Sequence, residues 1–141
     1  MIFRNSLISR NIVADYFQSS APVSDWSTST FGSWVTTTFT VDFTAPCDGI
    51  VVFNGYVFGK HSAAGGEWWA RIYEDTTGLS EESRSRKTNA DYWNTMPLNG
   101  IAAISAGSHT FVLKIYLNIA GTVSIPKDTK FTRICGIFFK T

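Results

Sequence analysis

Side chains that could carry out catalysis are scattered along this chain. The two histidines, His61 and His109, have no nucleophile and acid placed with them in a recognisable relay. Adjacent carboxylates occur at 74–75 and 81–82, but neighbouring side chains of an extended chain point to opposite sides. Neither pair could therefore act as acid and base on one bond. These residues predict a protein that is not an enzyme.

Two further patterns approach ligand sites without meeting their requirements. The segment GYVFGKHS (55–62) has three residues between its glycines and a histidine after Lys60, whereas a phosphate loop needs four residues and then Ser or Thr. Cys47 and Cys135 lie far apart, and zinc usually takes four ligands in close pairs. No cofactor or metal is expected. The cysteines are expected to be reduced thiols packed as small apolar side chains, with a disulfide between them as the alternative.

Aromatic residues beside a long polar loop indicate binding instead. Residues 76–91 form the longest polar stretch, well beyond the ~2–5 residues of ordinary hairpin loops. Trp68 and Trp69 are adjacent, so one of them must face outward from a strand, toward a subunit interface or a ligand. The residues expected to form a ligand or contact surface are Trp69, Arg84, Arg86, Tyr92 and Trp93.

The elements that position these residues have the period of β-strands. Residues 34–43 alternate apolar and hydroxylated side chains, which predicts a half-buried strand. Residues 50–58 are apolar on both faces, which predicts a central strand covered on two sides. Further strands are predicted over 67–75, 92–95, 101–105, 109–119 and 130–139. This spacing indicates an all-β chain, an antiparallel β-sandwich with jelly-roll topology.

Composition restricts the range of partners. The 141 residues suit one domain, and 44% of them are hydrophobic. The net charge of +1 provides no general attraction for nucleic acid or for an anionic membrane. No segment approaches the ~20 apolar residues of a membrane span, and no signal peptide is recognised at the N-terminus. The chain is therefore expected to be made in a cytoplasm and kept whole.

Residues 1–30 differ from the sandwich domain expected over residues 31–141. They combine apolar residues of no sustained period with a linker-like stretch, SSAPVSDWSTST. A short helix over 5–17 and an additional edge strand of the sandwich are alternatives for this segment. The favoured interpretation is an arm that attaches the domain to a larger particle. The residues expected to make that attachment are Ile2, Phe3, Arg4, Leu7, Ile8 and Arg10.

Three segments between residues 34 and 141 carry a resemblance to known proteins. They are FTAPCDGIVVF (43–53), with its proline and glycine between phenylalanines, AISAGSHTFVLKIYL (103–117) and the closing FTRICGIFF (131–139). Together they resemble the jelly-roll head shared by tumour-necrosis-factor-like domains, complement-type globular heads and many phage fibre and decoration proteins. The resemblance implies a homotrimer around a threefold axis that lacks catalytic residues.

The chain has no collagen-like stalk and no recognised signal peptide, unlike the animal members, which favours the phage side of this resemblance. The expected function is that of a virion protein, a trimeric head decoration or fibre that contacts other virion proteins. The alternatives are a receptor-binding fibre tip that recognises a host glycan or protein, and a carbohydrate-binding module. The residues expected in the trimer interface are Tyr56, Phe58, Tyr73 and Tyr116.

Overall fold

The computed structural model describes residues 14–86 and 89–141, and the regular elements in these ranges are β-strands. They form two antiparallel sheets, named here sheet A and sheet B. Sheet A contains β1 (Ala14–Gln18), β2 (Trp26–Thr28), β4 (Gly49–His61), β8 (Tyr92–Ile104), β10 (Val123–Ile125) and β11 (Cys135–Lys140). Sheet B contains β3 (Trp34–Ala45), β5 (Trp68–Glu74), β6 (Thr77–Gly78), β7 (Ser83–Arg84) and β9 (Gly107–Leu117). No helix in the described part of the chain could cross a membrane.

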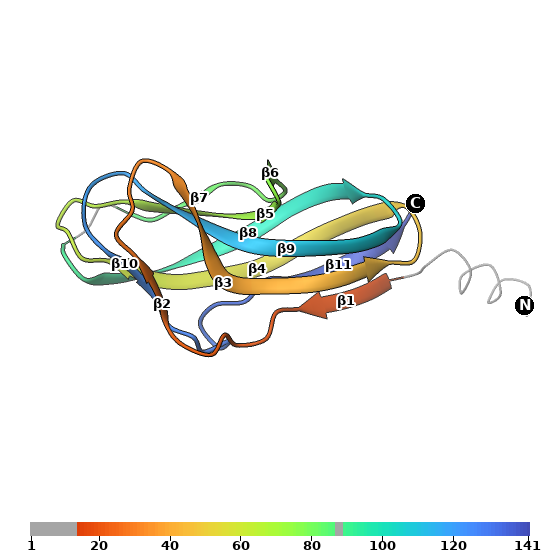
Figure 1. Ribbon diagram of the computed structural model, residues 1–141, viewed down its shortest axis with the longest axis horizontal. Coiled ribbons are helices and arrows are strands. Elements are labelled where there is room, and N and C mark those ends of the chain that lie inside the picture. Colours follow the sequence, from red (N-terminus) through yellow and green to blue (C-terminus); the bar gives the residue numbers. More distant parts are fainter. Residues whose placement is uncertain (1–13, 87–88) are drawn as a thin grey trace, which may run out of the picture.

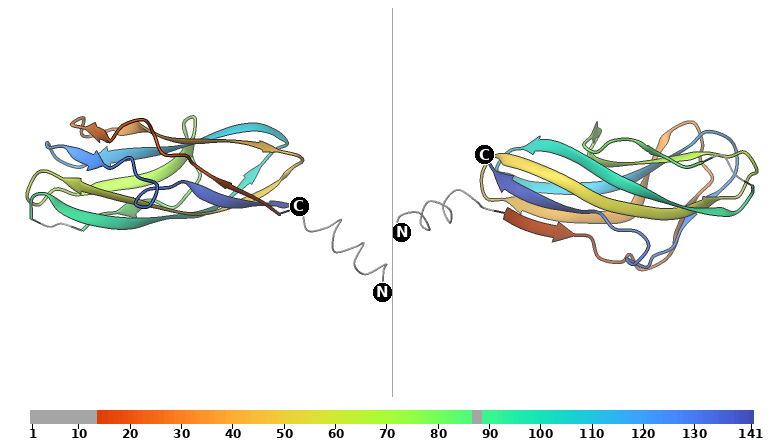
Figure 2. Two further views of the ribbon diagram at one scale, coloured as in Figure 1. Left: turned by 90° about the horizontal axis from the view of Figure 1, so that it is seen from below. Right: turned by 180° about the vertical axis from the view of Figure 1, so that it is seen from behind.

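Strand β4 is the centre of sheet A. β8 pairs with it along its whole length, while β11 and β10 pair with opposite ends of its other edge. β1 and β2 extend the sheet beyond β11 and β10. In sheet B, β9 lies between β3 and β5, and β6 and β7 lie beyond β5. Figures 1 and 2 show the two sheets packed as an elongated sandwich, so the predicted all-β sandwich is confirmed.

Alternate residues of the long strands fill the space between the sheets. In β3, Phe39 and Phe43 are buried while Thr40 between them is exposed, as the alternation of residue types predicts. In β5, Trp68 is fully buried and Trp69 lies on the opposite face, partly exposed. The expectation that one of these two tryptophans faces outward is confirmed.

The apolar segment 50–58 lies within β4, but only one of its faces is covered by the other sheet. Val51 and Phe53 face sheet B and are buried. Ile50 and Val52 on the other face are only half-buried. The prediction that both faces are covered is therefore wrong within a single chain. Hydrogen bonding to strands on both sides makes β4 central, but no described strand packs on the outer face of sheet A.

The sandwich includes residues 14–18 and 26–28, which lie before residue 31, where the sequence predicts that it starts. β1 and β2 both lie within the range assigned to the arm and linker, and both pair with strands of sheet A. Phe17 of β1 enters the core, where its burial holds the strand in place. Residues 14–18 thus form an edge strand of the sandwich, which was one of the alternatives for this segment. The residues expected to anchor the arm lie in 1–13, outside the described residues.

The segments 92–95 and 101–105, predicted as separate strands, are parts of the single strand β8. Pro97 interrupts the sequence pattern but not the strand, where it pairs with Tyr56. Proline lacks an N–H donor, and an edge strand such as β8 has one side on which no ladder bond is made. The predicted loop 76–91 contains the two short strands β6 and β7.

Candidate interaction surfaces

The outer face of sheet A carries a continuous apolar surface. The strand register places Tyr16, Ile137, Val52 and Ile101 in one row across β1, β11, β4 and β8. The next row holds Phe139, Ile50 and Ala103. These seven residues, which include no charged side chain, are named here the sheet A patch. Ile101 is 70% exposed and Tyr16 is 57% exposed.

Aromatic side chains continue this face toward the other end of β4. The Phe58 ring stacks on Trp93 at 4.7 Å and lies 5.1 Å from Phe131. Trp93 and Phe131 both remain exposed. The ammonium of Lys60 lies 5.2 Å from the centre of the Trp93 ring and 3.0 Å from Oδ1 of Asp91. Between this aromatic group and the sheet A patch lie the exposed, paired Asn54 and Asn99, and Arg133 donates a hydrogen bond to Gln18 at 2.7 Å, so the patch is bordered by polar and charged groups on this side.

The outer face of sheet B carries an aromatic belt, formed by Trp34, Trp69, Tyr73 and Tyr116. Trp69 and Tyr116 stack at 4.5 Å with an interplanar angle of 7°. Trp34 contacts Tyr116 at 5.7 Å and Tyr73 at 5.5 Å. The guanidinium of Arg84 lies 4.6 Å above Trp69. These rings stack on one another and on neighbouring cations, and together they form an ordered aromatic surface on this face.

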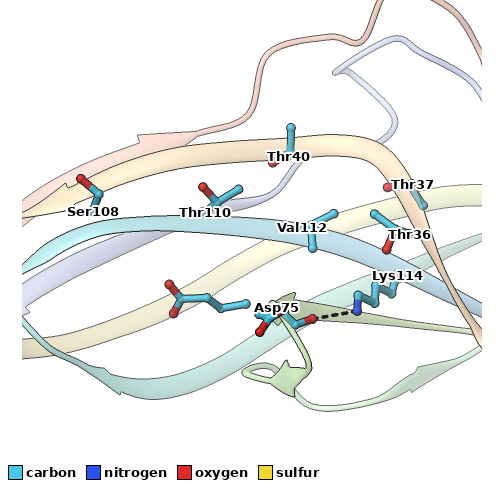
Figure 3. A pocket seen from close by; sticks show the side chains of 9 residues that line it. Thr36, Thr37, Thr40, Asp75, Ser108, Thr110, Val112 and Lys114 are labelled. Carbon is cyan, nitrogen blue, oxygen red and sulfur yellow. Dashed lines mark hydrogen bonds between the residues drawn. The ribbon is translucent and has the colours of Figure 1, made fainter.

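A groove of about 670 Å³ lies beside the belt on the same outer face. Side chains of β3, β9 and the end of β5 surround it (Figure 3). Hydroxyl groups come from Thr36, Thr37, Thr40, Ser108 and Thr110. Charged groups come from Glu74, Asp75 and Lys114. The groove is therefore polar and close to electrically balanced, unlike the outer face of sheet A.

A β-bulge in β3 shapes this groove. Residue 36 pairs with residue 114 and residue 40 with residue 112, so three residues of β3 stand opposite one of β9. The hydroxyl of Thr37 accepts a hydrogen bond from the N–H of Phe39 at 3.1 Å and donates to the carbonyl of Leu113 at 2.8 Å. The buried hydroxyl thus bonds to backbone groups on both strands at the bulge, and it holds the distortion in place.

The two histidines lie in different environments. Nδ1 of His109 lies 2.7 Å from Oε1 of Glu74 and Nε2 lies 2.8 Å from the Ser105 carbonyl. Burial lowers the pKa of His109, but these two acceptors outweigh it and raise the pKa above 6.5. Both ring nitrogens then donate, which is the charged imidazolium form.

His61 is buried in the loop end of sheet A, and its pKa moves in the other direction. Its Nδ1 accepts a hydrogen bond from the N–H of Ala63 at 3.0 Å, so this nitrogen carries no proton. A Cβ at Gly66 or Gly121 would come within 2.4 Å of the ring. Burial in this tight space lowers the pKa of His61 below 6.5 and keeps the ring neutral.

We expect the free energy of unfolding to be greatest near pH 6.5, the ordinary histidine pKa. As the pH falls below it, unfolded His61 takes up a proton that the folded state resists, so stability is lost toward its lowered pKa. As the pH rises above 6.5, unfolded His109 loses its proton while folded His109 keeps it. The stability that the protonated His109 contributes is therefore lost as the pH rises toward its raised pKa. Urea unfolding between pH 5.5 and 8 measures both limbs. His109→Gln should abolish only the alkaline decline, and an unchanged profile in that variant contradicts the assignment.

The residues predicted to form a contact surface do not come together. Trp69 and Arg84 contact each other on sheet B, whereas Trp93 lies on the outer face of sheet A with Tyr92 beside it in β8. Arg86 is exposed and follows β7. The alternation of side chains along a strand predicts which of them share a face of that strand, but it does not predict which sheet the strand joins.

The residues predicted for a trimer interface are divided in the same way. Tyr56 and Phe58 lie on the outer face of sheet A, and the Tyr56 hydroxyl donates to the Thr129 carbonyl at 2.9 Å. Tyr73 and Tyr116 belong to the belt on sheet B. The four residues thus lie on the outer faces of two different sheets. The sheet A patch was missed by the sequence analysis, although the two-sided apolar character of residues 50–58 was a signal for it.

Metal binding finds no support in the described residues, where no group of three or more His, Cys, Asp or Glu side chains could hold an ion. Cys47 and Cys135 are free thiols in the structure. Cys135 is buried in β11, and burial raises the pKa of its thiol. A raised pKa keeps this thiol protonated and unreactive at neutral pH.

Comparison with known proteins identifies the fold. No family model and no curated protein matches this sequence. Among solved structures, Eiger TNF from S. frugiperda matches 94% of each chain with a TM-score of 0.56 and 11% identity. Murine APRIL at pH 8.0 matches 90% of this chain and 100% of its own, with a TM-score of 0.57 and 8% identity.

A viral protein shares the same architecture. The VP2 subviral particle protein of infectious bursal disease virus matches with a TM-score of 0.56 and 17% identity. The match covers 89% of this chain but only 32% of that one. Identities this low establish the fold alone. At that level the resemblance seen in the sequence is confirmed, because this chain folds as a jelly roll of the type found in TNF heads and in viral capsid proteins.

Proposed function

We propose that this chain is a non-enzymatic structural protein of a phage particle, a homotrimeric jelly-roll head that serves as a decoration or fibre. The sheet A patch carries the proposal. Contiguous apolar patches are uncommon on monomeric surfaces and mark interaction sites. In this patch Ile101 and Tyr16 stand in one row with Val52 and Ile137, so an apolar partner could bury all four side chains at once.

A further copy of this chain is a suitable partner for the patch. The patch has no charged side chain, and the chain has a net charge of only +1, so copies do not repel one another strongly. Closed symmetry lets every copy bury the same surface without leaving one exposed. The start of β1 and the C-terminus lie at the same end of the sandwich (Figure 1), where Ala14 pairs with Phe139. Residues 1–13 would attach the trimer to the particle from that end, through the anchoring residues expected from the sequence.

We expect the full chain to sediment as a trimer at micromolar concentration, with three times the 15.6 kDa chain mass. Ile101→Lys should convert it to a folded monomer, because the lysine places a charge within the buried interface. Ile101 is exposed in the single chain, so its replacement should leave the fold intact. Val23→Lys is the matched control, since Val23 is 96% exposed and lies outside the patch. A monomeric native protein, or an Ile101→Lys variant that remains trimeric, contradicts the proposal.

A receptor-binding fibre tip is the second candidate function. It is favoured by the groove and belt on sheet B, which stay open to solvent if sheet A is buried between subunits. Fluorescently labelled protein distinguishes the two roles. A tip should bind whole host cells, whereas a decoration protein should bind only the particle.

A further inference from the structure

We propose that the groove over the β3 bulge binds a neutral carbohydrate. The groove lies on the outer face of sheet B, away from the apolar patch of sheet A, and does not depend on the trimer. Its volume of about 670 Å³ falls within the ~300–1,000 Å³ typical of small-ligand sites. A neutral sugar presents many hydroxyls that both donate and accept hydrogen bonds, so it requires a surface of matching mixed polarity.

The groove provides that mixture from groups with unused hydrogen-bonding capacity. Within the described residues, the hydroxyls of Thr36 and Ser108 have no protein partner. Thr110 donates to Oδ1 of Asp42 at 2.7 Å, which leaves its oxygen free to accept. The ammonium of Lys114 donates one of its three hydrogens to the Asp75 carbonyl at 2.7 Å, as Figure 3 shows. A sugar lying here would find donors and acceptors within one short strip.

The arrangement of charge favours a neutral ligand over an anionic one. Glu74 and Asp75 both line the groove, and Glu74 is fixed by its contact with His109. Lys114 is the cation that lines it. With the His109 imidazolium beside Glu74, the groove has no net positive charge to hold an acidic sugar, whereas neutral hydroxyls could donate to the carboxylates and accept from Lys114.

The apolar side chain of Val112 gives the C–H face of a sugar ring a surface to pack on. Val112 lies within the groove between Thr40 and Tyr73, with which it pairs across β3, β9 and β5. Tyr73 in turn packs against Trp34 and beneath the Lys114 ammonium at 4.7 Å. The belt therefore holds Lys114 in position beside the groove. Rigid side chains of this kind reduce the entropy lost on binding.

Saturation-transfer NMR with the full chain tests the proposal, with maltotriose, lactose and chitotriose as neutral probes and sialyllactose as an anionic probe. We expect transfer to at least one neutral probe and weaker transfer to sialyllactose than to lactose. The double variant Thr110→Val, Lys114→Met should lower affinity for the bound sugar at least about tenfold, because it removes two hydrogen-bonding groups. Thr30→Val removes an exposed hydroxyl outside the groove and should bind as the native protein does.

Three results would overturn the inference: no transfer to any neutral probe, equal affinity in the double variant, or stronger transfer to sialyllactose than to lactose. Circular dichroism of each variant confirms that the sandwich is intact. Ile101→Lys separates this inference from the trimer proposal, because it alters sheet A only. That variant should bind sugar as the native protein does, whatever its state of assembly.

Discussion

Replacing Phe17 by alanine is expected to lower the free energy of unfolding by about 3–5 kcal/mol, the usual cost of removing a buried phenylalanine ring. Phe17 is only 6% exposed, although it belongs to the edge strand β1. Its ring lies 5.1 Å from Phe43, 5.3 Å from Phe111 and 6.0 Å from Phe53. Its ring thus packs against strands of both sheets, and alanine would leave a cavity in the core.

Chemical denaturation of Phe17→Ala and of Asp15→Ala measures this effect. Asp15 lies in the same strand but is exposed, so its replacement should change stability by less than about 0.5 kcal/mol. Deletion of residues 1–18 should cost at least as much as Phe17→Ala, whereas deletion of residues 1–10 leaves β1 and should leave the unfolding midpoint unchanged. If the longer deletion also leaves the midpoint unchanged, residues 14–18 are part of an arm and not of the sandwich.

Replacing Gly55 by alanine is expected to cost about 3 kcal/mol, at the upper end of overpacking effects. A Cβ at Gly55 would lie 2.4 Å from the Arg133 carbonyl oxygen and 3.3 Å from the Cys135 nitrogen. Both obstacles are backbone atoms, so the strands themselves would have to separate. The mutual hydrogen bonds between Tyr56 and Arg133, at 3.0 and 2.8 Å, would then weaken.

The comparison for this prediction is Asn54→Ala, one residue earlier in β4. Because Asn54 is exposed, its replacement by alanine is expected to change the free energy of unfolding by less than about 0.5 kcal/mol. Guanidinium unfolding of the two variants gives the difference directly. In the middle of an ordinary strand, glycine to alanine stabilises by roughly 0.5–1 kcal/mol. A stabilised Gly55→Ala variant would show that β4 and residues 133–135 are not held this close.

Much of the sandwich follows from local patterns in the sequence. The alternation in residues 34–43 specifies which side chains of β3 enter the core, because a strand places successive side chains on opposite faces. The same rule separates Trp68 from Trp69. The apolar segment 50–58 correctly indicates a central strand, since it lies in β4 with partners on both edges. Each of these predictions depends on neighbours a few residues apart.

The surfaces that could have a function depend on contacts between distant parts of the chain, and the sequence does not determine them. The sheet A patch exists because residues 16, 52, 101 and 137 fall in register across four strands. The groove exists because β3 bulges against β9, seventy-six residues along the chain from Thr37 to Leu113. Residues 14–18 belong to the sandwich and not to the expected arm, because the Phe17 side chain is buried in the core. Strand periodicity fixes a side chain's face within its own strand, whereas sheet membership and register are decided by packing and hydrogen bonding among strands far apart in sequence.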